Sequence, residues 1–104
     1  MILDRIIDGI LKGKFRFTSH SLEEMYNDDL GESDIFFSTI RGEVIENYEN
    51  LKPFPACLIL GLNQKGIPIH SLWAFNDSAE LAILITTYIP DAKKWSKDFK
   101  ERKK

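Results

Sequence analysis

Two histidines are the side chains in this sequence best suited to acid–base chemistry. His20 and His70 are the only two imidazoles, and a histidine with an unperturbed pKa of about 6.5 can take up or release a proton near neutral pH. One reaction open to such groups is metal-free cleavage of RNA, in which the ribose 2′-hydroxyl is the nucleophile and a base, an acid and a cation act beside the phosphate. Tyr88 and Lys94 add a hydroxyl and a cation. His20, His70, Tyr88 and Lys94 therefore form the candidate catalytic set.

Each histidine also has a structural interpretation. His20 lies at the predicted start of a helix, where the helix dipole disfavours the charged ring and backbone N–H groups can receive a phosphate. The same ring could instead cap that helix or pack against it. His70 shares a strand face with Pro68, Leu72 and Ala74, and a histidine among apolar neighbours is more often a hydrogen-bonded core residue. Both interpretations stay open for both residues.

Metal and cofactor chemistry have little support in the sequence. His20, Glu23 and Glu24 have the spacing of a partial metal site on a helix, but acids near a helix start also stabilise its dipole without a metal. The single cysteine, Cys57, has no thiol neighbour with which to hold zinc. Phosphate-binding glycine loops, a nucleophile elbow and the dinucleotide fingerprint are absent, which argues against an NTPase, a serine hydrolase and a nicotinamide enzyme. We expect no metal and no cofactor.

Helical patterns occupy the first part of the chain. Apolar residues at helical spacing predict an amphipathic helix over residues 2–12, which Gly13 ends. A second helix should begin near His20, after Ser/Thr candidates for the N-cap. A third short helix is predicted over residues 33–40, with Gly42 at the place where a helix end favours a left-handed residue.

Strand patterns follow. Residues 43–48 are strand-like, and the apolar runs 57–62 and 67–75 should form an antiparallel hairpin around the turn at residues 63–66. Residues 81–88 are rich in Ile, Leu and Thr and predict a further strand. The fold expected is α+β, with N-terminal helices packed on a 3–4 stranded antiparallel sheet, as one domain over residues 1–104.

A final helix is predicted from Pro90 onward. Trp95 and Phe99 would share its buried face, and a set of lysines would share the solvent face: Lys93, Lys97, Lys100 and Lys104. From Asp91 to Lys104 the chain carries seven basic and three acidic residues, whereas the rest has a net charge of −6. Such a basic end could meet nucleic acid or an acidic partner, or be a solvated helix end. Lys93, Lys97 and Lys100 are the candidate nucleic-acid contacts.

Composition limits the remaining classes. A chain of 104 residues that is 43% hydrophobic can form one buried core without disulfides or a structural metal. The lone cysteine fits a reducing compartment, and the first residues lack the basic leader and apolar run of a signal peptide. No window approaches the roughly 20 apolar residues of a membrane span. We therefore expect a cytoplasmic protein without membrane contact.

Five short fragments, in order, resemble the domain-of-unknown-function 4258 family, relatives of the RelE and BrnT ribonuclease toxins. They are Phe17-Thr18-x-His20, Gly42-Glu43-Val44-Ile45-Glu46-x-Tyr48, Cys57-Leu58-Ile59-Leu60-Gly61, Pro68-Ile69-His70 and Ile85-Thr86-Thr87-Tyr88-x-Pro90-Asp91-x-x-x-Trp95. The resemblance implies a RelE-like domain in bacteria that is often paired with a small antitoxin, in some cases one bearing a zinc finger. It implies a class and not a substrate.

One position departs from the family pattern. Members often carry an arginine one helical turn after the first histidine, and Glu24 takes that place here. An acid would repel a phosphate. Two hypotheses follow: a toxin-like domain of a toxin–antitoxin pair acting as a metal-independent endoribonuclease, or a non-catalytic binding module. The module would dock a small acidic or zinc-finger partner, or a second copy of itself as a homodimer.

Overall fold

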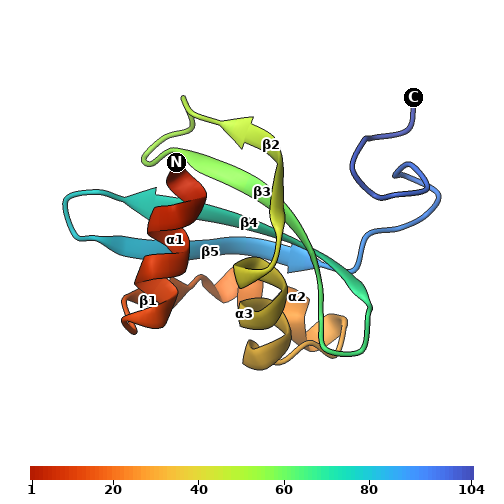
Figure 1. The fold of residues 1–104 in the computed structure, drawn as a ribbon, viewed down its shortest axis with the longest axis horizontal. Helices are drawn as coiled ribbons and strands as arrows, with labels where there is room; N and C mark the ends of the chain where they lie inside the picture. The colour runs from red at the N-terminus through yellow and green to blue at the C-terminus, as the bar shows by residue number, and fades with distance from the viewer.

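Three helices and five strands form along residues 1–104, all of which the computed structural model describes (Figure 1). In chain order they are α1 (Ile2–Leu11), β1 (Phe15–Phe17), α2 (Ser19–Asn27), α3 (Glu32–Ile40), β2 (Glu43–Tyr48), β3 (Ala56–Leu62), β4 (Pro68–Asn76) and β5 (Leu81–Tyr88). The protein is α+β, as the sequence predicted. None of its helices has the length and apolar character needed to cross a membrane.

The sheet is larger than the sequence indicated, and it is mixed. Its strand order is β1-β5-β4-β3-β2, with β1 parallel to β5 and all other neighbours antiparallel. The prediction of three or four antiparallel strands was therefore wrong. It missed β1, because a strand of three residues is too short to show the alternation by which strands are recognised. The hairpin of β3 and β4 forms around residues 63–66 as expected.

The main core lies between the helices and one face of the sheet. Side chains from α1, α2 and α3 join those of β3, β4 and β5 in one cluster, with Trp73 fully buried among them. The Trp73 indole N–H donates to the Thr39 hydroxyl of α3 at 3.0 Å, so the ring is buried without an unpaired polar atom. All three helices thus cover the same face, and the other face carries no helix.

Two glycines allow α3 to lie close to β3. A Cβ on Gly61 would stand 1.8 Å from the carbonyl oxygen of Ser38, and one on Gly42 would stand 2.6 Å from a methyl group of Ile59. Gly42 has no positive φ, so it does not provide the left-handed residue that the sequence suggested. Its role is close approach of backbone to backbone.

The predicted C-terminal helix does not form. Residues 89–104, called the C-terminal segment below, contain turns and one antiparallel bridge between Trp95 and Arg102. The Asp91 carbonyl accepts one turn of hydrogen bonds, after which Ser96 and Asp98 bond to each other and to nearby backbone N–H groups. Short polar side chains of this kind compete with helical hydrogen bonds, which explains why the helix stops after its first turn. In Figure 1 the segment leaves β5 at the end of the sheet away from α1.

Candidate functional site

Two β-bulges bring polar side chains onto the face of the sheet without helices. In β2 the extra residue is Ile45, so Glu46 points to the same face as Glu43 despite the odd spacing between them. In β5 the extra residue is Ile85, and Tyr88 is thereby paired with His70 of β4. The alternation of β4 places His70 on this face, because Ile69 and Trp73 belong to the main core.

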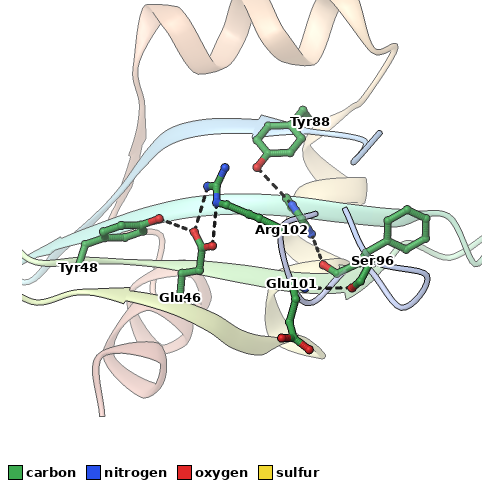
Figure 2. Close-up of polar contacts among 8 residues, drawn as sticks. Glu46, Tyr48, Tyr88, Ser96, Glu101 and Arg102 are labelled. Atoms are coloured by element: carbon green, nitrogen blue, oxygen red, sulfur yellow. Dashed lines mark hydrogen bonds and ion pairs between the residues drawn. The ribbon is translucent and has the colours of Figure 1, made fainter. Parts of the chain in front are cut away.

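The C-terminal segment is fastened over these side chains (Figure 2). The Arg102 guanidinium donates to both carboxylate oxygens of Glu46, at 2.9 and 3.1 Å, and lies over the Trp95 ring at 4.6 Å. The Lys100 ammonium pairs with Glu43 at 3.0 Å. These contacts, called the clasp below, hold the segment against β2, and Trp95 is buried within it.

His70 is sealed beneath the clasp. Its side chain has no exposed surface, and the Trp95 ring packs edge-on against it with centroids 4.3 Å apart. Nε2 lies 2.8 Å from the Phe99 carbonyl oxygen, which can only accept, so Nε2 carries the proton. Nδ1 then accepts from the Tyr88 hydroxyl at 3.2 Å. Both ring nitrogens are occupied inside the protein, and neither is available to a substrate.

The electrostatics of this cluster keep its members in fixed protonation states at neutral pH. Burial lowers the pKa of His70, against the opposing effects of the Phe99 carbonyl and the Glu46 carboxylate. Burial raises the pKa of Tyr88, and the hydrogen bond to Glu46 raises the pKa of Tyr48. The hydrogen bonds from Arg102 lower the pKa of Glu46. A neutral imidazole, two phenols and an ion pair form a structural network here, not an acid–base pair aimed at solvent.

His20 and His70 do not meet. His20 is exposed in the first turn of α2 and makes no side-chain hydrogen bond, and the buried residues of that helix, Ser21 and Met25, face the sheet. His70 lies on the sheet face that carries no helix. The N-cap of α2 is Thr18, whose hydroxyl accepts from the Ser21 N–H, so His20 does not cap the helix either.

Tyr88 and Lys94 do share a hollow of about 390 Å³, called the Tyr88 hollow below. It is lined by Glu24, Asp28, Tyr88, Ile89, Asp91, Lys94, Trp95 and Arg102. Three carboxylates face two cations, so its formal charge is −1 and not the positive value that RNA cleavage requires. Glu24, the residue that departs from the family pattern, is one of these carboxylates.

The three lysines proposed to contact nucleic acid differ in their surroundings. Lys100 is part of the clasp, and Glu43 raises its pKa and offsets its charge. Lys93 and Lys97 are exposed and form no ion pair, and Lys94 also forms none. They project from an irregular segment and not from one face of a helix, so the predicted lysine stripe is not formed.

Metal ligands and a reactive thiol are not found near the cluster. No group of three His, Cys, Asp or Glu side chains could hold a metal ion, and Glu23 and Glu24 do not form one with His20. Cys57 is fully buried, and burial raises the pKa of its thiol to about 11, so it is no nucleophile at neutral pH.

Sequence reasoning missed the Glu46–Arg102 ion pair of the clasp. Glu46 lay in a recognised fragment without an assigned role, and Arg102 lay in what was expected to be a helix. The Glu46–Arg102 pair joins residues 56 positions apart. The only available signal was their opposite charge, which many other pairs in the chain share.

Comparison with known proteins gives a match to one family model. No curated protein and no solved structure matches the chain. One family model, described as a domain of unknown function (DUF4258), matches residues 17–89, which run from the last residue of β1 to the residue after β5 and make up more than half of the chain. The helix α1 and most of the C-terminal segment lie outside the match. The chain therefore belongs to the DUF4258 family.

Proposed function

We propose that this chain is a non-catalytic binding domain that docks an acidic segment of a partner protein through the lysines of its C-terminal segment. The observation that carries the proposal is that the seven basic residues of this segment fall into two groups, one paired with carboxylates and one unpaired. Lys100 and Arg102 bind Glu43 and Glu46 and fasten the segment. The other five are exposed and form no ion pair: Lys93, Lys94, Lys97, Lys103 and Lys104.

The clasp prepares these lysines for binding. A free basic tail would lose conformational entropy on association, whereas this segment is already fixed by Trp95, by Arg102 and by the hydrogen bond from His70 to its backbone. Binding then costs mainly the ordering of the lysine side chains. In this proposal His70 does not transfer protons. It supports binding by holding the segment in place.

Charge favours a protein partner over RNA. The chain outside the last fourteen residues has a net charge of −6, and the Tyr88 hollow beside the lysines is acidic. A phosphate backbone running past the lysines would meet those carboxylates, because it carries charge at every nucleotide. A short acidic segment can place its few carboxylates on the lysines alone. The family resemblance suggests a small antitoxin as the partner.

A direct test measures binding of a labelled Glu-rich peptide by fluorescence anisotropy at low and high salt. We expect salt-sensitive binding that weakens roughly tenfold when Lys93, Lys94 and Lys97 are all replaced by glutamine, since rim charges each contribute up to about 1 kcal/mol. Lys65→Gln is the matched control, because this lysine is exposed in the β3–β4 turn and forms no ion pair. Binding that the triple variant leaves unchanged, or that Lys65→Gln weakens equally, would contradict the proposal.

A metal-independent endoribonuclease of a toxin–antitoxin pair remains a second candidate. It is favoured by the shared hollow of Tyr88 and Lys94, two of the residues proposed for catalysis. Helix α2 also lines that hollow through Glu24, four residues after the exposed His20.

Incubation of the purified chain with labelled RNA tests this second candidate. The binding proposal predicts intact RNA at micromolar protein. Cleavage that His20→Ala or Lys94→Gln abolishes, while both variants keep the wild-type melting temperature, would instead support the nuclease and overturn the non-catalytic assignment.

A further inference from the structure

A second hollow lies on the face of the sheet without helices, between the β2–β3 loop and strands β1, β4 and β5. It has a volume of about 320 Å³ and is called the Phe54 hollow here. Its floor is apolar: Ala74 and Ile83 belong to a small buried cluster against which Phe54 and Ile85 pack. The exposed side chain of Leu51 lines it as well.

Two cations flank this apolar floor. Arg16 and Lys52 line the hollow, both are exposed, and neither forms an ion pair. Arg16 reaches this face because Phe15 and Phe17, its neighbours in β1, pack against the main core on the other side. Elsewhere Arg5, Lys12 and Lys14 are each paired with a carboxylate.

The absence of carboxylates distinguishes the Phe54 hollow from every other hollow of the molecule. The other three are lined by two or three acidic side chains each, including Glu49 and Asp77 in the one beside the N-terminus. In an acidic chain, an apolar floor with two unpaired cations and no acid complements an occupant that combines an apolar group with negative charge.

We propose that the Phe54 hollow receives one apolar side chain of the partner's acidic segment, with adjacent carboxylates of that segment pairing with Arg16 and Lys52. The volume lies at the lower end of the range for ligand sites, which suits a single anchoring side chain. This inference rests on the proposed function, because it names the chemistry of the same partner and adds specificity to the charge attraction of the lysines.

The experiment compares two labelled Glu-rich peptides that differ only in one central residue, leucine or serine. We expect the leucine peptide to bind roughly tenfold more tightly, because the free energy gained by burying one leucine side chain corresponds to at least that ratio of dissociation constants. Leu51→Ser should abolish this preference, and Leu62→Ser should preserve it. Both leucines are exposed, at 40% and 54%, so neither substitution should unfold the protein. Only Leu51 lines the hollow, which makes Leu62→Ser the matched control.

Charge variants separate failure of this inference from failure of the proposed function. Replacing both Arg16 and Lys52 by glutamine should weaken the binding of both peptides. The triple lysine variant should also weaken the binding of both peptides, but it should leave the preference for the leucine peptide intact. If both peptides bind in a lysine-dependent manner but equally well, the hollow is not the anchor site and the proposed function stands. If neither peptide binds, the proposed function fails and this inference fails with it.

Other occupants would give different results, each of which overturns the proposal. Sodium octanoate that displaces the leucine peptide and binds more tightly than it does would identify a free amphipathic anion as the ligand. A concentration-dependent dimer of the pure chain that Leu51→Ser dissociates would identify a second copy. Both are measurable, by titration calorimetry and by light scattering after size exclusion.

Discussion

Replacing His70 by phenylalanine tests whether this ring is a structural element. Phenylalanine keeps an aromatic ring against Trp95 but removes the hydrogen bonds to Tyr88 and to the Phe99 carbonyl. Each partner left without a hydrogen bond costs about 1–3 kcal/mol where it is buried, and both partners here are partly buried, so the lower part of that range applies. We expect a loss of about 2–3 kcal/mol from the free energy of unfolding, measured by urea denaturation.

His20→Phe is the matched control, since it replaces the other histidine in the same way. His20 is exposed and unbonded, so its replacement should change the free energy of unfolding by less than about 0.5 kcal/mol. Against a total stability of roughly 5–15 kcal/mol, the two variants should separate clearly. Equal stabilities of wild type and His70→Phe would refute the structural role.

The pH dependence gives the same prediction a second measurement. Burial lowers the pKa of His70 in the folded state, so the unfolded chain, with an ordinary histidine near 6.5, binds the proton more readily. Its stabilising contribution is complete above about pH 6.5 and is lost as the pH falls, by at most about 1.4 kcal/mol per pH unit. The pKa of Glu46 is also lowered, but from 4.5, so its contribution is lost only at lower pH.

The stability of wild type should therefore fall between about pH 7 and pH 5 more steeply than that of His70→Phe. Parallel profiles for the two proteins over this range would mean that the ring titrates as it does in water, and the sealed geometry would be wrong.

Two further predictions concern the clasp and the close approach of α3 to the sheet. Arg102→Gln removes a bidentate pair with the partly buried Glu46 carboxylate, so hydrogen exchange in the C-terminal segment should accelerate, with a loss of about 1 kcal/mol; unchanged exchange would contradict the clasp. Gly61→Ala would place a methyl group 1.8 Å from the Ser38 carbonyl oxygen and should destabilise the fold by more than about 3 kcal/mol in urea denaturation. Gly31→Ala meets nothing closer than 3.7 Å and should cost about 1 kcal/mol or less, the remaining cost arising because Gly31 is the N-cap of α3, where glycine is preferred over alanine.

Local patterns were enough to predict much of the fold. The helix predicted over residues 2–12 is α1, and the strand predicted over residues 81–88 is β5. The β3–β4 turn also follows from its own residues, because the Asn63 side chain accepts from two backbone N–H groups of the turn and Gly66 has a φ of 80°. Each of these features depends on residues that are close together in sequence.

Features decided by distant contacts were not predictable in this way. The strand β1 forms because three residues pair in parallel with β5. Their sequence is too short to show the alternation of apolar and polar residues by which a strand is recognised. The bulges fall on Ile45 and Ile85, which are ordinary strand residues, yet each bulge changes which face the following residues take. The final helix was predicted to begin at Pro90, with Trp95 and Phe99 on its buried face, but Phe99 adopts a φ of 62° and only Trp95 is buried.

The role of His70 shows why a motif alone does not assign catalysis in this fold. The alternation of β4 predicted which residues share a face with His70, but not which face the helices cover, and it could not distinguish a reactive ring from a buried one. The choice is made by the Phe99 carbonyl oxygen, which belongs to a residue 29 positions away. Every residue has a carbonyl, so no side-chain pattern could reveal this partner. A family member in which no chain segment covers the corresponding histidine would expose the ring, and the same strand would then offer an acid–base group in place of a structural one.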